Sequence, residues 1–460
     1  MRATTIIWTI GLLIAVFSGG NTAAAELPKG ITDDPLLNSR YLLFGSDRLR
    51  IRTWRWAVQR GNTDMVAPII FSLRYLDPEE REAAAEVLRK LTGQRFGDNW
   101  IRWTQWQQTR PDIVPFEGYS TFLAGILKSL DEKFIDLIYP GIKHSIRLEE
   151  ILWGGARAKT GIPALNNPTM IAGSSADYLK NNEPVFGVAI NGDVRAYPYR
   201  FMDWHEMLND TIGGVPVALA YCTLCGSGIL FSTEVEGFAE PIIFGSSGLL
   251  YRSNKLMFDD KTESLWNQFT GEPAVGKLTN SGIKLKPLPL VTTTWGDWQK
   301  RHPDTQVLSP DTGFERDYRP GKPYGKYFKS SKLLFPAALK KDGRKPKSEV
   351  FALRLGHSSK SWPLKEFAGG AVINDRAGVV NLVLVGDEKS REIRAYRRAE
   401  EEFEKVEKSD RALTQLRSNQ GLWSVTEEAL IGPNGEALSR LPGHIAYWFA
   451  WQTYFDGASE

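Results

Sequence analysis

The chain has 460 residues, of which 42% are hydrophobic and 24% are charged, and its formal net charge is +3. This length is enough for two or three domains. The small net charge gives no electrostatic case for nucleic acid, which favours a basic face or stripe, so we expect no nucleic-acid partner. Only five histidines and two cysteines are available as ligands for a metal site.

Residues 1–25 have the composition of a secretory signal peptide. Arg2 supplies a positive start, residues 6–17 are apolar, and Ala23-Ala24-Ala25 is a small-residue cleavage site. An uncleaved N-terminal anchor is the alternative. No later segment has the roughly 18 unbroken apolar residues of a spanning helix. We therefore expect an exported protein, periplasmic or extracellular, with no transmembrane span in its mature chain.

Residues 26–150 have the pattern of a helical, tryptophan-rich region. Asp77 is a predicted N-cap and Gly93 the stop of the helix that follows it. Tryptophans recur at helical spacing, which is typical of a core: Trp100, Trp103 and Trp106. The paired helices resemble a HEAT-like repeat, but solenoids usually need three or more units. We expect these helices to pack on the rest of the protein, and a protein partner on this region is the alternative.

From residue 183 the pattern changes to short strands joined by turns. Residues 348–386 repeat the layout of the first strands at a constant offset: Val185 and Pro198 recur as Val350 and Pro363, each 165 positions later. The sequence thus predicts an α+β fold, in which a helical region precedes a tandem-duplicated, mostly antiparallel β-rich domain. The predicted boundaries are 1–25 for the signal peptide, 26–150 for the helical region, 151–309 for copy one, 310–347 for a connector, and 348–457 for a degenerate copy two without cysteine.

Cys222 and Cys225 follow an apolar, strand-like run and precede a glycine turn. Three interpretations are open. A disulfide across so short a loop would stabilise the fold little. Thiol–disulfide exchange would use one thiolate to attack and the other to resolve. Two thiolates can also bind copper or form half of a zinc site. A strand pattern after the pair argues against a thioredoxin-like arrangement.

His205 is the candidate third metal ligand or base, and a core histidine is the alternative interpretation. Glu206, Asp259 and Asp260 are candidates for groups that contact or join the ligands. Copy two has Asp387 where copy one has the first cysteine of the pair, and it has no cysteine at all. This difference predicts that copy one carries the site and that copy two is its structural partner.

Several motifs together resemble the DUF3179 family, a domain family of unknown function. They are Gly161-Ile162-Pro163-Ala164-Leu165, Ala196-Tyr197-Pro198, Trp204-His205-Glu206-Met207-Leu208-Asn209-Asp210, Tyr221-Cys222-Thr223-Leu224-Cys225-Gly226-Ser227 and Asp260-Lys261-Thr262-Glu263-Ser264-Leu265-Trp266. The resemblance covers about 150–457. It implies an exported protein that carries this Cys-x-x-Cys, and it supplies no reaction.

We therefore expect an exported protein with a site formed by Cys222, Cys225 and His205 that binds copper or zinc or performs thiol redox chemistry. The site is expected near the seam between the two copies, because pockets favour domain interfaces. The competing hypothesis is a non-catalytic binding or scaffold module with a structural Cys222–Cys225 disulfide. The sequence specifies neither a substrate nor a partner, and it leaves open whether the protein is an enzyme.

Overall fold

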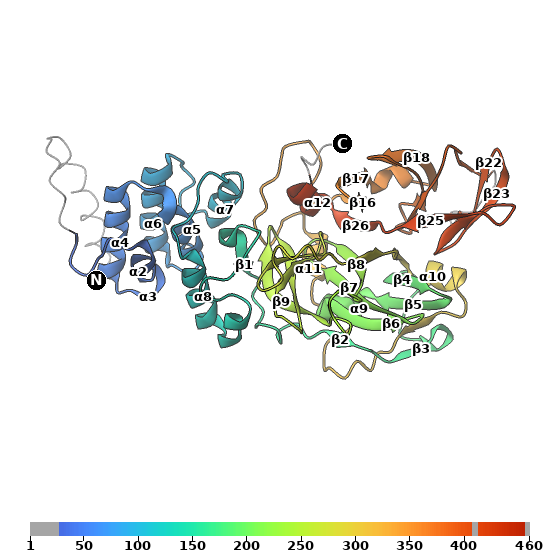
Figure 1. Cartoon of the computed structure of the whole chain (residues 1–460), viewed down its shortest axis with the longest axis horizontal. Helices are drawn as coiled ribbons and strands as arrows, with labels where there is room; N and C mark the ends of the chain where they lie inside the picture. The colour runs from blue at the N-terminus through green and yellow to red at the C-terminus, as the bar shows by residue number, and fades with distance from the viewer. Residues whose placement is uncertain (1–26, 407–412, 456–460) are drawn as a thin grey trace.

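The computed structural model describes residues 27–406 and 413–455. A helical region occupies one end of an elongated molecule, and mostly antiparallel β-sheets with a few short helices make up the rest (Figure 1). This order of helices and then sheets confirms the predicted α+β fold class. The predicted signal peptide lies outside the described residues. Within the described ranges, no helix combines the length and apolar character needed to cross a membrane.

Short helices and tight turns build the N-terminal region. In chain order they are α2 (Pro35–Ser39), α3 (Tyr41–Phe44), α4 (Asp47–Arg60), η2 (Thr63–Met65), α5 (Val66–Ser72), α6 (Pro78–Thr92), α7 (Trp100–Gln108), α8 (Tyr119–Leu130), η3 (Glu132–Asp136) and η4 (Leu148–Glu150). Helix α6 has the predicted ends: the Asp77 carboxylate accepts a hydrogen bond from Glu80 N at 2.9 Å, and Gly93 follows with φ of 75°. Glycine reaches this left-handed conformation without strain.

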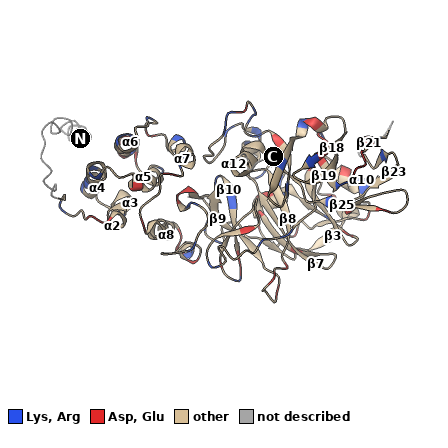
Figure 2. Cartoon of the chain, turned by 45° about the horizontal axis from the view of Figure 1, so that its top comes forward, with Lys and Arg blue, Asp and Glu red and all other residues tan. Residues whose placement is uncertain are grey.

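The helical region shares one hydrophobic core with the neighbouring sheet. Trp103, in the middle of the predicted tryptophan stripe, is fully buried. The same core contains Leu249, Leu256 and Val275 from strands far along the chain. The helices therefore pack on the rest of the protein, as expected. Figure 2 shows acidic and basic residues scattered over both the helical and the β parts.

The first β unit (residues 151–309) carries the cysteine pair. Its elements are β1 (Ile151–Trp153), β2 (Leu165–Asn166), β3 (Met170–Ala172), η5 (Gly173–Ser175), β4 (Pro184–Ile190), β5 (Asp193–Pro198), α9 (Tyr199–His205), β6 (Met207–Ile212), β7 (Val215–Cys222), β8 (Ser227–Ser232), β9 (Phe244–Tyr251), β10 (Asn254–Asp259), β11 (Leu265–Asn267), β12 (Glu272–Val275), β13 (Pro287–Leu288), β14 (Val291–Thr294), α10 (Trp295–Arg301) and β15 (Gln306–Leu308). The sheet with strand order β13-β8-β7-β6-β2 holds the cysteine strand at its centre.

The second β unit (residues 348–457) follows the connector (residues 310–347), which contains α11 (Gly325–Lys329). The described elements of the second unit are β16 (Glu349–Leu355), β17 (Ser358–Pro363), η6 (Leu364–Phe367), β18 (Ala371–Ala377), β19 (Val380–Asp387), β20 (Glu392–Arg397), β21 (Glu404–Lys405), β22 (Gln415–Ser418), β23 (Gly421–Val425), β24 (Ala429–Ile431), β25 (Ala437–Leu441), β26 (His444–Tyr447) and α12 (Trp448–Phe455). Strands β17, β16 and β26 form one antiparallel sheet.

Each β unit contributes a strand that contacts the other unit. Strand β26 of the second unit contacts β8 of the first, and β14 of the first contacts β20 of the second. At this seam the backbone N–H of Tyr447 donates a 2.8 Å hydrogen bond to the carbonyl oxygen of Cys225. The seam therefore contacts the cysteine turn directly.

Candidate functional site

The cysteine pair occupies the turn between β7 and β8. Strand β7 is buried over its last six residues, which end at Cys222. Gly226 closes the turn with φ of 58°, and a Cβ there would lie 3.1 Å from the Tyr447 ring. Strand β8 begins one residue later, as predicted, so the segment that directly follows the cysteine pair is a strand and not a helix.

The two thiols are free and in contact. Their sulfur atoms are 2.8 Å apart, and the side chains are 2% and 0% exposed for Cys222 and Cys225. Cys225 Sγ lies 3.3 Å from the Ser253 carbonyl oxygen and accepts a 3.3 Å hydrogen bond from Asn254 Nδ2. Gln268 accepts a second hydrogen bond from that amide at 2.7 Å. The Ser253 carbonyl and the Asn254 amide therefore both contact the sulfur atom of Cys225.

The Cys225 thiol is less acidic than an ordinary cysteine. Burial raises the pKa of Cys225 well above its ordinary value, and the hydrogen bond with Cys222 acts in the same direction. The nucleophile in thiol chemistry is the thiolate. Cys225 therefore stays protonated at neutral pH, which leaves Cys222 as the candidate attacking group.

Single-cysteine variants should show this difference. Cys222→Ser leaves only Cys225, and Cys225→Ser leaves only Cys222. Near pH 8 we expect Cys225 to be alkylated at least about tenfold more slowly than Cys222, since each unit of raised pKa lowers the thiolate fraction about tenfold. The rate for Cys222→Ser should still rise above about pH 9, where an ordinary thiol levels off. Alkylation followed by mass measurement gives both rates, with urea-unfolded protein as the control. Equal rates and equal pH profiles in the folded variants would contradict the assignment.

A buried ion pair between Lys255 and Glu206 lies next to the cysteine turn. Lys255 Nζ lies 3.2 Å from the Glu206 carboxylate and donates to the backbone oxygens of Glu206 at 3.2 Å and Tyr221 at 3.4 Å. The same carboxylate accepts hydrogen bonds from Thr223 at 3.2 Å and Ser246 at 3.3 Å. The predicted residue Glu206 thus contacts the turn through Thr223.

His205 lies at the end of α9 and engages other partners. Its Nδ1 is 2.8 Å from the Pro163 carbonyl oxygen, and its Nε2 is 2.6 Å from the Tyr318 hydroxyl. A carbonyl only accepts, so Nδ1 carries the proton and Tyr318 donates to Nε2. Burial lowers the pKa of His205, which favours the neutral ring. Both nitrogens are therefore occupied, and this arrangement matches the core-histidine alternative rather than a ligand beside the thiols.

Asp259 and Asp260 shape the turn after β10. Asp259 accepts hydrogen bonds from Lys261 N at 3.0 Å and Trp266 Nε1 at 2.8 Å. Asp260 accepts one from Ile243 N at 2.9 Å. Asp259 is thus bound within the turn after β10, Asp260 is bound by the residue before β9, and none of these contacts involves a thiol.

The predicted metal ligands do not form one group. Across residues 27–406 and 413–455, no three His, Cys, Asp or Glu side chains are arranged to hold a metal ion. Two thiolates on a tetrahedral zinc ion lie about 3.8 Å apart, because the Zn–S bond is about 2.3 Å long. The observed sulfur separation is 2.8 Å. The cysteine geometry is therefore closer to a disulfide than to a zinc site.

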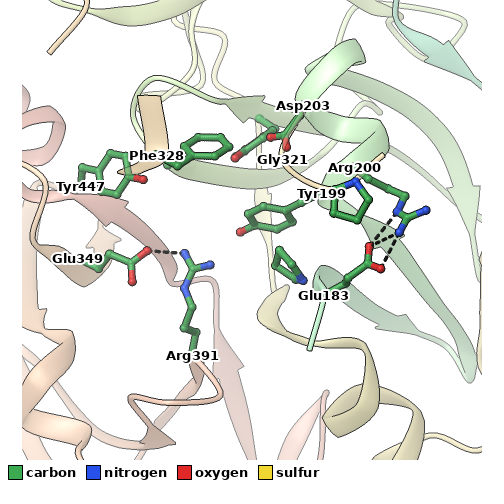
Figure 3. Close-up of a pocket in the computed structure, with 13 residues that line it drawn as sticks. Glu183, Tyr199, Arg200, Asp203, Gly321, Phe328, Glu349, Arg391 and Tyr447 are labelled. Atoms are coloured by element: carbon green, nitrogen blue, oxygen red, sulfur yellow. Dashed lines mark hydrogen bonds and ion pairs between the residues drawn. The ribbon is translucent and has the colours of Figure 1, made fainter. Parts of the chain in front are cut away.

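A pocket of about 240 Å³ opens beside the cysteine turn, at the seam where the site is expected. Figure 3 shows its walls: Tyr199 and Asp203 come from the first β unit, Phe328 from the connector, and Tyr447 from the second β unit. Gly226, the residue after Cys225, also lines it. The pocket therefore joins all three segments of the β-rich part.

One carboxyl group in this pocket has no cation beside it. Asp203 is 5% exposed, and its Oδ1 has no hydrogen-bond partner among the described residues. Burial raises the pKa of the Asp203 carboxyl well above its ordinary value, although a hydrogen bond from Tyr221 acts in the opposite direction. Sequence reasoning missed Asp203, and its position directly before the Trp204-His205-Glu206 triplet is the only local signal.

The family comparison covers the connector, the second β unit and all but the first residues of the first β unit. A family model described as "Protein of unknown function (DUF3179)" matches residues 159–458. The chain belongs to the DUF3179 family. The predicted resemblance is thereby confirmed, and the cysteine turn and the pocket both lie inside the DUF3179 domain. No curated protein and no solved structure matches the chain.

Within the DUF3179 domain, Asp203→Asn should raise stability at neutral pH. The folded protein holds the Asp203 proton more tightly than the unfolded chain, so its stability falls as pH rises above about 4. The amide is not charged, and we expect a gain of about 1–3 kcal/mol at pH 7 that vanishes near pH 4. Urea unfolding of both proteins at the two pH values measures it. If Asp203→Asn were less stable than the native protein at pH 7, that result would contradict the interpretation of Asp203 as a buried carboxyl group without a compensating partner.

Proposed function

We propose that this DUF3179 protein is an exported thiol–disulfide redox protein, in which Cys222 and Cys225 alternate between a dithiol and a disulfide. The contact between two free sulfurs at 2.8 Å supports it. A disulfide bond is about 2.05 Å long, so the sulfurs need to approach by only about 0.8 Å. The predicted signal peptide supports export to a compartment where disulfides persist.

The proposed reaction exchanges two thiols for a partner disulfide. The Cys222 thiolate attacks one sulfur of the partner, a mixed disulfide forms, and the first partner thiolate leaves and takes up a proton. Cys225 then loses its proton and attacks Cys222 Sγ, which releases the second partner thiol. The cysteine pair is oxidised by two electrons, and the partner disulfide is reduced to two thiols.

Access to the thiols requires movement of the connector. The Tyr327 hydroxyl of α11 donates a 2.6 Å hydrogen bond to the carbonyl oxygen of Leu224, inside the Cys-x-x-Cys turn. Lys347 Nζ lies 3.7 Å from the centre of the Tyr327 ring and donates to the Ser330 carbonyl at 2.9 Å. We infer that the connector covers the cysteine pair until a partner displaces it.

Removing this hydrogen bond should expose the thiols more often. We expect Tyr327→Phe to speed alkylation of the native dithiol about fivefold, because one net hydrogen bond contributes about 1 kcal/mol. Tyr318→Phe, on the same connector, removes a hydrogen bond to His205 and none to the cysteine turn in the described structure, so it is the matched control. An unchanged alkylation rate in Tyr327→Phe would place the barrier elsewhere.

We further infer that the two β units arose by duplication. Strands β16, β17, β19 and β20 begin 165 positions after β4, β5, β7 and β8. The hairpin registers agree as well: Val185 pairs with Pro198, and Val350 pairs with Pro363. The reciprocal contacts at the seam also support this inference. In the second unit Asp387 takes the place of Cys222, so only the first unit keeps the redox pair.

Redox titration tests the proposed function. The full chain is equilibrated with mixtures of reduced and oxidised glutathione and then alkylated, and its intact mass is measured. We expect a single two-electron transition between two free thiols and one internal disulfide, and no such transition in Cys222→Ser. A pair that stays reduced in every mixture would overturn the proposal.

The second candidate is a scaffold with an inert cysteine pair, which the burial of both sulfurs favours. In that case a Cys222–Cys225 disulfide resists reduction while the protein is folded, and the helical region is the surface for a protein partner. The same titration separates the two hypotheses, because a scaffold shows no transition under native conditions. Copper or zinc bound by the two thiolates would be detected as metal that blocks alkylation.

A further inference from the structure

The pocket between the two β units carries one excess acidic group. Its lining contains two arginines, and each already has its own carboxylate (Figure 3). Arg200 binds Glu183 at 2.6 Å, and Arg391 binds Glu349 at 2.5 Å. Asp203 has no such partner. The ionised pocket lining therefore has a net charge of minus one.

One oxygen of the Asp203 carboxyl group also lacks a hydrogen-bond partner among the described residues. The Asp203 residue is only 5% exposed, and its Oδ1 accepts no hydrogen bond from any described residue. Leaving a buried acceptor unsatisfied costs about 1–3 kcal/mol. A ligand that donates a hydrogen bond to Oδ1 would remove this cost.

Aromatic rings surround the space in front of this carboxyl group. Tyr199, Phe328 and Tyr447 line the same pocket, and Figure 3 shows them on separate sides of it. The Arg391 guanidinium already lies 5.8 Å from the centre of the Tyr199 ring. Such ring faces attract cations, most strongly where water is excluded.

We propose that this pocket binds a small protonated amine, with its ammonium group on Asp203 and its carbon atoms against Tyr199, Phe328 and Tyr447. A volume of about 240 Å³ is below the range of about 300–1,000 Å³ that holds drug-sized ligands. Arg391 Nε also lacks a partner, but an anion there would meet Glu349. The charge balance therefore favours a cation.

Calorimetry on the full chain with reduced thiols tests the site. The probes are ethylammonium and ethanolammonium, with acetate as the anion and acetamide as the neutral molecule. We expect both ammonium probes to bind, and Asp203→Asn to weaken them at least about tenfold, or about 1.4 kcal/mol. Asp260→Asn, which removes an exposed carboxylate in another hairpin, should leave the affinity unchanged.

A second readout does not depend on the variant. At a pH where the free Asp203 is protonated, binding of an ammonium ion should release about one proton, because the ligand favours the carboxylate. Titrations in two buffers of different ionisation enthalpy measure that release. The proposal is overturned if acetate or acetamide binds as well as the ammonium probes, if Asp203→Asn binds them unchanged, or if no ammonium probe binds. Since none of these outcomes depends on thiol oxidation, failure here is separate from failure of the proposed redox function.

Discussion

A Cys225→Ser variant is expected to accumulate a mixed disulfide on Cys222 when it is treated with oxidised glutathione. In the native protein Cys225 lies 2.8 Å away and displaces the bound thiol, so little adduct should remain. In Cys222→Ser the remaining thiol has a raised pKa and is fully buried. We expect at least about tenfold less adduct there, because thiolate attack forms the bond. Intact-mass measurement quantifies the adduct.

The double variant Cys222→Ser/Cys225→Ser is the control for this experiment and should carry no adduct. Reduction of the Cys225→Ser adduct should restore the starting mass. Two results would contradict the assigned order of the thiols. One is an equal amount of adduct in the two single variants, and the other is as much adduct in the native protein as in Cys225→Ser.

Lys255→Met is expected to lower the free energy of unfolding by about 3–5 kcal/mol, because it leaves the buried Glu206 carboxylate without its cation. The two side chains are only 3% and 9% exposed. The variant also removes a donor to the backbone of Tyr221, next to Cys222. Urea unfolding of the full chain, followed by tryptophan fluorescence, measures the loss.

A surface ion pair of similar length is the matched control for the buried one. Lys284 and Glu272 are 2.8 Å apart, but their side chains are 43% and 47% exposed. Lys284→Met should cost less than about 1 kcal/mol, since solvent screens such a pair. The double variant Lys255→Met/Glu206→Gln should recover part of the lost stability. If the buried and exposed lysine variants lose the same amount, the ion pair does not support the cysteine turn.

Features with short-range signals could be predicted from the sequence. Asp77 and Gly93 mark the ends of α6 because a cap and a left-handed stop each depend on a few neighbouring residues. Asn191 and Gly192 form the turn between β4 and β5, with φ of 50° and 80°. The apolar residues after the cysteine turn indicated strand β8 for the same reason.

The arrangement of the site depends on contacts that the sequence does not display. Lys255 binds a backbone oxygen 49 positions away, and His205 meets the Tyr318 hydroxyl 113 positions away. A histidine two residues from a buried strand looks the same whether its ring faces a thiol or a tyrosine. Asp203 was missed because its lack of a partner is a property of the folded pocket.

A free-thiol count combined with metal analysis, on protein purified from its native host, shows directly whether Cys222 and Cys225 form a redox pair. We expect two thiols that can be titrated, or one disulfide that thiol reagents reduce in the native state, without stoichiometric metal. About one copper or zinc ion per chain, lost in Cys222→Ser, would contradict this expectation and establish thiolate ligation instead. A disulfide that resists reduction until the protein unfolds would also contradict it, because that is the behaviour of a structural bridge.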